Sequence, residues 1–179
     1  MKVLLTHGYF IGEDAIEQKV MRPYPPLGLL YISAFLEQKR IEHEVFDSTF
    51  SEFEMLCQYI QTHKPDFIGI YVNFLTRINI LKTINFIKKE ASLKSIKIIL
   101  GGPDVRHNMD EYLKRGADYL VVGEGELTFS ELIEGLQIKK EVKNIQGIAY
   151  LDDESQLVFT SERTHLPDLQ TLPFPNRKK

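Results

Sequence analysis

The sequence predicts an α/β protein with a doubly wound, parallel sheet of five strands and a C-terminal β-hairpin. Five short apolar runs alternate with amphipathic segments of helical periodicity, which is the pattern of consecutive β-α units. Two of these runs, residues 67–71 and 96–100, are almost entirely apolar or glycine. Such composition is expected of central parallel strands that are covered by helices on both faces.

The first two β-α units occupy the amino-terminal third. Residues 3–5 form a short apolar strand, and residues 25–38 carry apolar side chains at helical spacing behind two prolines that suit a helix start. A second strand is expected over residues 44–46. The following helical stripe begins at residue 53 and includes Cys57, which we expect in the core, and it stops before the next proline.

Three further units complete the sheet. The strand over residues 67–71 precedes a helix at about 78–90. After the fourth strand, Asn108 with a glutamate three residues later predicts a capping box for a helix over residues 109–115, which a glycine closes. The fifth strand is expected at residues 119–122, and its helix at 127–136.

Right-handed crossovers between five such units favour the flavodoxin-like strand order 2-1-3-4-5. Residues 147–151 and 157–160, separated by an acidic turn, then predict the hairpin. We therefore expect an α/β domain over residues 1–140, a hairpin extension over 141–162 and a proline-containing linker over 163–179.

Composition excludes several classes of protein. The 179 residues carry 22 basic and 25 acidic side chains, a net charge of −3, and no basic stripe that would suggest nucleic acid as a partner. The single cysteine excludes a disulfide framework and a cysteine-rich metal site in this chain. No apolar run has the length of a membrane span or a signal peptide, so we expect a cytoplasmic protein.

A ligand crevice is expected beyond the carboxyl ends of strands one and three, where the winding direction reverses. The loops that reach it are residues 7–24, 72–77, 101–107 and 123–126. Gly101, Gly102 and Pro103 follow a buried strand, where residues without a Cβ let a ligand approach the backbone. A tight turn without a ligand is the alternative interpretation.

Several ligands of such crevices lack their motifs here. A phosphoacceptor site would need acidic residues after strand one, and a dinucleotide site would need a G-x-G-x-x-G loop there. The chain has His7 there, followed by Gly8 and Gly12, which do not make up that loop. The carboxylates of Glu124 and Glu126 could serve acid/base chemistry, although their position favours a role at a helix N-terminus. His43 and His63 are expected near solvent-facing positions at element edges, and His107 lies beside an expected helix cap that gives this segment a structural purpose.

Three motifs together resemble the amino-terminal cobalamin-binding domain of B12-dependent radical SAM proteins, such as anaerobic magnesium-protoporphyrin monomethyl ester cyclases. They are Pro-Pro-Leu-Gly-Leu-Leu at 25–30, Gly-Gly-Pro at 101–103, and the Gly-Ala-Asp-Tyr to Gly-Glu-Gly-Glu segment at 116–126. The resemblance extends over residues 1–176, because the tail at 172–176 is similar to the linker that leads into a radical SAM barrel.

The resemblance implies cobalamin held against the carboxyl ends of the strands, with its nucleotide tail inside the domain. S-adenosylmethionine and a 4Fe-4S cluster would belong to a downstream domain of the same polypeptide, because the C-x-x-x-C-x-x-C loop is absent from this chain. The residues expected to bind the cofactor are His7, Tyr9, Gly12, Pro26, Leu27, Gly28, Val72, Asn73, Phe74, Leu75, Thr76, Gly101, Gly102, Pro103, Gly123, Glu124, Gly125 and Glu126.

The resemblance is loose at two places. Tyr71 and Val72 stand where related corrinoid proteins carry a small residue and an S-x-L-like segment. The Asp-x-His-x-x-Gly motif of corrinoid methyltransferases is also missing, since His7 aligns with its aspartate and Tyr9 with its histidine. We therefore expect base-off cobalamin without a histidine ligand, with His7 as the alternative.

The expected function is a cofactor-binding domain of a radical SAM methyltransferase or cyclase that is not catalytic alone. Two other functions remain open at this point. One is a stand-alone corrinoid carrier, and the other is an interaction module that has lost the cofactor.

Overall fold

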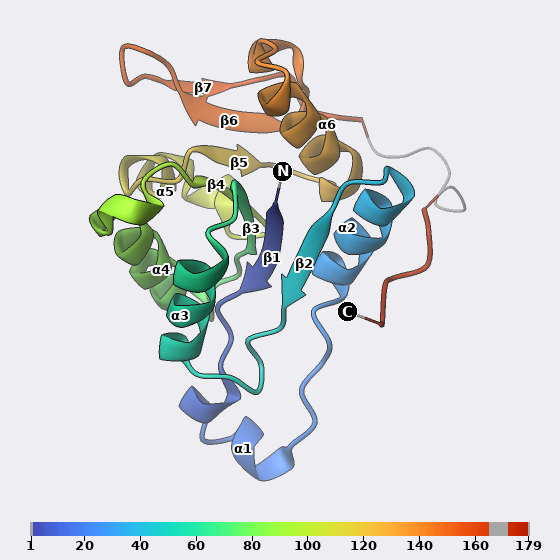
Figure 1. The fold of residues 1–179 in the computed structure, drawn as a ribbon, viewed down its shortest axis with the longest axis vertical. Coiled ribbons are helices and arrows are strands. Elements are labelled where there is room, and N and C mark those ends of the chain that lie inside the picture. The colour runs from blue at the N-terminus through green and yellow to red at the C-terminus, as the bar shows by residue number, and fades with distance from the viewer. Residues whose placement is uncertain (1, 165–171, 179) are drawn as a thin grey trace.

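A computed structural model describes residues 2–164 and 172–178 and confirms the predicted fold (Figure 1). One sheet has the order β2-β1-β3-β4-β5-β6-β7, so the expected order 2-1-3-4-5 is present and the hairpin extends it. The strands are β1 (Val3–His7), β2 (His43–Phe46), β3 (Phe67–Tyr71), β4 (Lys97–Gly101), β5 (Tyr119–Val121), β6 (Ile148–Leu151) and β7 (Leu157–Phe159). The helices are α1 (Glu17–Val20), α2 (Leu27–Gln38), α3 (Phe53–His63), α4 (Arg77–Lys89), α5 (Met109–Lys114) and α6 (Gly125–Gln137).

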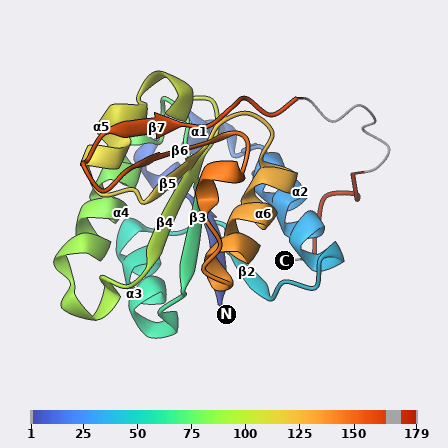
Figure 2. The ribbon, with the colours of Figure 1, turned by 90° about the horizontal axis from the view of Figure 1, so that it is seen from above.

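Helices cover both faces of the parallel strands, as Figure 2 shows. Helices α3, α4 and α5 bury one face in a core cluster that includes Leu56, Ile84 and Tyr112. Helices α2 and α6 bury the other face around Leu29 and Phe129. Because side chains alternate along a strand, the fully buried runs predicted from sequence supply both clusters at once.

The predicted hairpin continues the main sheet. Strand β6 pairs antiparallel with β5, with Leu120 opposite Ala149, and β7 pairs antiparallel with β6. The backbone N–H of Val122 donates to the carbonyl of Gly147 at 2.8 Å and joins the hairpin to the end of β5. The first five strands are thus parallel and the last two antiparallel.

The loop between β1 and α2 extends beyond the carboxyl ends of the strands (Figure 1). It contains a 3₁₀ turn, Ile11–Glu13, and the short helix α1, neither of which the sequence predicted. The amide of Asn79 on α4 anchors this loop, donating to the carbonyl of Gly8 at 3.1 Å and to the carboxylate of Glu13 at 2.7 Å.

Residues 172–178, which the sequence analysis assigned to a linker, lie against α2. The backbone N–H of Asn176 donates to the carbonyl of Leu30 at 3.0 Å, and its side-chain amide donates to the Glu37 carboxylate at 2.9 Å. The amide also lies 3.4 Å from the Ser33 hydroxyl. Pro167 of the expected linker lies outside the described residues.

The expectation that His43 faces solvent is wrong. Its side chain is only 4% exposed and lies under α2. Nδ1 lies 2.9 Å from the carbonyl of Ile41, which can only accept, so Nδ1 carries the proton and Nε2 accepts from the Ser33 hydroxyl at 2.7 Å. The polar partner on α2 removes the cost of burying the imidazole.

Two other local predictions need correction. Asn108 makes no capping hydrogen bond to α5, because its amide donates back to the carbonyl of Asp104 at 3.1 Å. Cys57 is half-buried, since it lies at the flank of the α3 stripe whose centre is Leu56 and Ile60. Burial nevertheless raises the pKa of the Cys57 thiol to about 11, assisted by the nearby carboxylate of Glu54.

Candidate functional site

Two cavities lie at the carboxyl edge of the sheet, at the predicted crevice. The inner cavity, of about 230 Å³, lies between the sheet and helices α2 and α6. The outer cavity, of about 350 Å³, lies under the loop that connects β1 to α2. Gly28, Leu29 and Tyr71 line both cavities and so form their common boundary.

The inner cavity is apolar because neighbouring strands present aligned apolar positions to it. Leu5 pairs with Gly69, and Gly69 pairs with Ile99, so one row across three strands forms its floor. Phe129 of α6 packs on this row. A Cβ built at Gly69 would lie 2.6 Å from the Phe129 ring and 2.9 Å from Leu5, so the glycine lets α6 approach the sheet closely.

The two glycines after β4 have different surroundings. A Cβ at Gly101 would meet nothing nearer than 3.8 Å, so this residue opens onto the inner cavity. Gly102 has a φ of +110°, and a Cβ there would lie 2.4 Å from the carbonyl oxygen of Val72. Gly102 therefore meets a backbone requirement, whereas Gly101 leaves open space.

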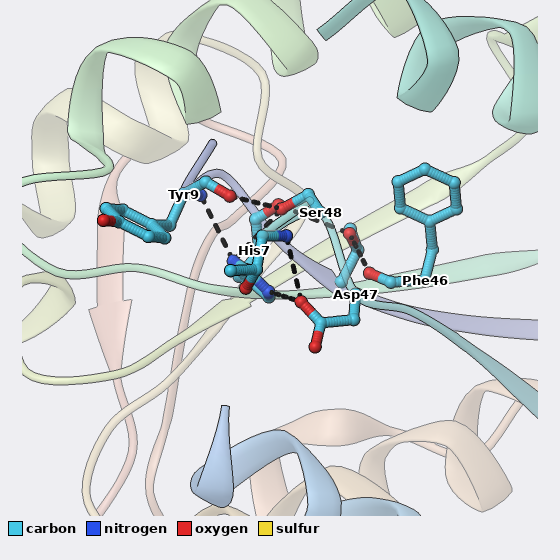
Figure 3. A network of polar contacts seen from close by, with 7 residues as sticks. His7, Tyr9, Phe46, Asp47 and Ser48 are labelled. Carbon is cyan, nitrogen blue, oxygen red and sulfur yellow. Dashed lines mark hydrogen bonds and ion pairs between the residues drawn. The ribbon is translucent and has the colours of Figure 1, made fainter. Parts of the chain in front are cut away.

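His7 ends β1 inside a polar network at the outer cavity (Figure 3). The backbone N–H of Tyr9 donates to Nδ1 of His7 at 3.2 Å, and Nε2 lies 2.9 Å from the carboxylate of Asp47. Because a backbone N–H only donates, a neutral imidazole carries its proton on Nε2 and points it at Asp47. Ser48 donates to the carbonyl of His7 at 2.8 Å. Both ring nitrogens thus have partners within the protein.

The network also fixes the charge on Asp47. Partial burial would raise the pKa of its carboxyl group, but hydrogen bonds from His7 and from Thr49 outweigh it and lower the pKa to about 2. The backbone N–H of Thr49 donates to the carboxylate at 3.0 Å. Asp47 is therefore an anion over the whole physiological range and holds the His7 ring in place.

The loop after β3 is ordered by its own side chains. The N–H of Asn73 donates to the Thr76 hydroxyl and the N–H of Thr76 donates to the Asn73 side chain, each at 3.0 Å. Both residues line the outer cavity. These reciprocal bonds close the loop at the start of α4.

A buried carboxylate braces the loop after β4. Asp104 accepts two hydrogen bonds from Arg77, at 3.0 and 2.7 Å, and one from the Tyr112 hydroxyl at 2.5 Å. The Arg77 pair lowers the pKa of the Asp104 carboxyl group against the opposing effect of burial, and Tyr112 assists it. The guanidinium also lies 5.7 Å above the Phe74 ring. Asp104 thereby ties the glycine loop to α4.

The structure brings most of the predicted site residues together at these cavities. The inner cavity is lined by Gly28, Gly101, Gly102, Gly123, Glu124, Gly125 and Glu126. The outer cavity is lined by His7, Tyr9, Pro26, Leu27, Gly28, Asn73 and Thr76. Five predicted residues line neither cavity. These are Gly12 and Pro103, the fully buried Val72, and Phe74 and Leu75, which are 78% and 74% exposed.

Sequence reasoning missed the apolar walls of the inner cavity, including two aromatic side chains. The missed residues are Leu5, Leu29, Ile32, Gly69, Ile70, Tyr71, Ile99, Val121 and Phe129. A glycine inside an otherwise buried strand was the available signal for Gly69. The others read only as core, because strand register and the position of α6 decide which core residues face a cavity.

Charged and metal-binding chemistry is limited in the described part of the chain. Residues 2–164 and 172–178 contain no group of three His, Cys, Asp or Glu side chains arranged to hold a metal ion. In the same residues, no helix combines the length and apolarity needed to cross a bilayer. The site therefore offers a mostly apolar inner cavity and an outer cavity whose apolar walls also carry polar groups from His7, Asn73 and Thr76.

Comparison with known proteins identifies the family. Residues 15–133 match the model of the B12 binding domain. An uncharacterised methyltransferase from Pyrococcus horikoshii is 28% identical over 176 residues, covering 92% of this chain and 36% of that protein. The anaerobic magnesium-protoporphyrin IX monomethyl ester cyclase from Synechocystis is 26% identical over 151 residues, covering 81% of this chain and 30% of the cyclase. The chain thus spans about a third of the length of these curated relatives.

A solved structure has the same fold. The cobalamin-dependent S-adenosylmethionine radical enzyme OxsB, with aqua-cobalamin and S-adenosylmethionine bound, superposes with a TM-score of 0.80 at 20% identity. The match covers 98% of this chain and 24% of OxsB. Because the family model matches more than half of the sequence on this fold, the chain belongs to the B12-binding domain family.

Proposed function

We propose that this chain binds cobalamin, with the nucleotide tail in the inner cavity and the corrin ring toward the outer one. The supporting observation is the apolar inner cavity, which opens at the carboxyl edge beside Gly101, where an added Cβ would meet nothing nearer than 3.8 Å. A Cβ at Gly101 would project into this cavity, so the backbone leaves room that a flat apolar group can fill. The residues present therefore fit the proposed cofactor.

Each wall has a defined task in this proposal. Leu5, Ile99 and Phe129 would enclose the apolar base of the tail, while the polar groups at the outer cavity would face the hydrophilic edge of the corrin. Cobalamin supplies methyl transfer or radical chemistry when bound, and this chain only binds, orients and shields it. The chemical step would belong to another domain.

We also propose base-off binding without a histidine ligand to cobalt. His7 is 4% exposed, and each of its ring nitrogens already has a partner. Ligation by either nitrogen would break the bond to Tyr9 or the bond to Asp47. Removing one partner of a buried hydrogen bond costs about 1–3 kcal/mol, which opposes such a rearrangement.

For the whole protein, we propose a cobalamin-dependent radical SAM methyltransferase or cyclase. The curated relatives support this, since one is named a methyltransferase and the other a cyclase, and both are about three times as long as the matched region. S-adenosylmethionine and a 4Fe-4S cluster would then be held by a further domain of the same polypeptide. We also propose a cytoplasmic location, which a chain with a single cysteine fits.

Titration with hydroxocobalamin, followed by absorbance and calorimetry, tests the proposal. We expect Gly101→Val to weaken binding at least tenfold, because its side chain would fill the inner cavity. Ala91→Val is the control, since it places the same valine side chain at an exposed turn before β4, away from both cavities. Absence of binding by the unmodified chain at high micromolar cofactor would favour a domain that has lost its cofactor.

The cobalt environment is tested separately. In the reduced Co(II) state, a nitrogen ligand splits the electron paramagnetic resonance lines, whereas base-off cobalamin without histidine lacks this splitting. We expect no nitrogen splitting in the unmodified chain and an unchanged spectrum for His7→Ala. A nitrogen splitting that disappears in His7→Ala would assign His7 as the ligand.

A further inference from the structure

Tyr71, the last residue of β3, stands between the inner and outer cavities. It lines both of them, with Gly28 and Leu29 as the other shared residues. Ligand pockets commonly have volumes of about 300–1,000 Å³. The inner cavity, at about 230 Å³, falls below this range by itself, and joining it to the outer cavity would bring the total well inside the range.

The ring of Tyr71 lies between Gly28 and Gly102, two glycines of the sequence motifs. A Cβ at Gly102 would lie 3.1 Å from ring atoms Cδ2 and Cε2, and a Cβ at Gly28 would lie 3.9 Å from the same atoms. The ring therefore fills the space between the first turn of α2 and the loop after β4. In this structure the two glycines accommodate an aromatic side chain of the protein itself.

Little holds the ring in this position. Tyr71 is only partly buried, and no residue in the described ranges hydrogen-bonds its hydroxyl group. By contrast, the tyrosine below the same loop, Tyr112, is fully buried and donates to Asp104. Rotation of Tyr71 would break apolar contacts but no hydrogen bond to another described residue. Such side-chain rotations need no change of backbone.

We propose that Tyr71 is a gate between the two cavities and sets the selectivity of this chain among corrinoids. This proposal rests on the proposed function. A corrinoid with a nucleotide tail must occupy both cavities, so the ring has to leave the passage before the tail enters. A corrinoid without a tail needs only the outer cavity and leaves the ring in place.

The gate reduces affinity for tailed ligands only. Displacing the ring costs free energy, so only a fraction of the molecules is in the open state. The apparent affinity for a tailed ligand is the affinity of the open state multiplied by that fraction. The same displacement is not required for a tail-less corrinoid. Replacing Tyr71 by a smaller residue should therefore strengthen binding of the tailed ligand and leave binding of the tail-less ligand unchanged.

The experiment compares hydroxocobalamin with cobinamide, which lacks the nucleotide tail, for Tyr71→Ala, Tyr71→Val and Tyr71→Phe. Valine keeps the strand preference of this position and guards against a folding defect in the alanine variant. We expect the two small variants to bind hydroxocobalamin at least tenfold more tightly, with a faster association rate, and cobinamide within about twofold of the unmodified chain. Tyr71→Phe keeps the ring and should match the unmodified chain for both ligands.

The outcomes separate the gate from the proposed function. Weaker or unchanged hydroxocobalamin binding by the small variants would overturn the gate and assign Tyr71 as a wall of the site. Equal strengthening for both corrinoids would also overturn it, because the ring would then block access in general. Failure of the unmodified chain and of the folded small variants to bind either corrinoid would contradict the proposed function itself.

Discussion

Alanine substitutions at Gly101 and Gly102 separate open space from backbone packing within one dipeptide. A Cβ at Gly102 would lie 2.4 Å from the carbonyl oxygen of Val72, which is a main-chain atom. The same residue is fixed from its other side, since the N–H of Val72 donates to the carbonyl of Gly101 at 2.7 Å. Neither partner can move away without disturbing the junction of β3 and β4.

The magnitude follows from two contributions. An L-residue forced into the left-handed region costs about 1–2 kcal/mol, and the backbone shift needed to relieve overpacking costs about 1–3 kcal/mol. We expect Gly102→Ala to lower the free energy of unfolding by about 2–5 kcal/mol, a large part of the roughly 5–15 kcal/mol of a typical domain. Gly101→Ala should change it by less than about 0.5 kcal/mol, because its Cβ meets nothing closer than 3.8 Å.

Thermal and urea unfolding followed by circular dichroism measure this difference. At about 2–4 °C per kcal/mol, Gly102→Ala should melt about 4–20 °C below the unmodified chain, and Gly101→Ala within about 2 °C of it. Equal melting temperatures for the two variants would refute the reasoning. A larger loss for Gly101→Ala would show that the space beside it is needed for folding.

Three further predictions concern the polar contacts. Asp104→Asn should lower the free energy of unfolding, measured in urea, by about 2–3 kcal/mol, because it leaves the partly buried Arg77 without its anion. The control Asp110→Asn breaks only an exposed pair with Lys114 and should lower the free energy of unfolding by less than about 0.5 kcal/mol. The pKa of Asp47 is lower in the folded chain than the ordinary 3.8, so its contribution is present above pH 4 and lost as the pH falls toward 2. With the side chain 46% exposed, that contribution should stay below about 1 kcal/mol. The difference in urea midpoint between the unmodified chain and Asp47→Asn should shrink as the pH falls from 4 through about 2, and a constant difference would contradict the assignment. Asn176→Ala removes the side-chain hydrogen bonds to Glu37 and Ser33, so amide hydrogen exchange over residues 172–178 should accelerate while exchange in β3 stays constant. Unchanged exchange at 172–178 would mean that the backbone hydrogen bond to Leu30 of α2 is enough to hold this segment.

The order of strands was predictable because each buried run and each crossover helix is encoded locally. The antiparallel continuation of the sheet was not, since nothing in residues 148–151 specifies pairing with β5. Local signals failed where a distant group offered a better partner. The Asn108 amide bonds the backbone of Asp104 instead of capping α5, and His43 is buried because Ser33 of α2 meets its Nε2 atom.

The candidate site shows the same division. Motif glycines identified the loops that surround the two cavities, because an absent Cβ is visible in the sequence. The floor formed by Leu5, Gly69 and Ile99 depends on strand register, which cannot be predicted from local sequence patterns. The position of Tyr71 depends further on how α2 docks, so a residue that reads as the end of a strand becomes the boundary between two cavities.

The placement of the hairpin has a consequence for solubility. A sheet of seven strands has two free edges, and unpaired backbone groups at an edge invite pairing with another chain. Here the outermost strands are β7, with three residues, and β2, with four. The longer five-residue strands β1, β3 and β4 are all interior. By ending in such short strands, the sheet offers little template for edge-to-edge aggregation during synthesis or storage.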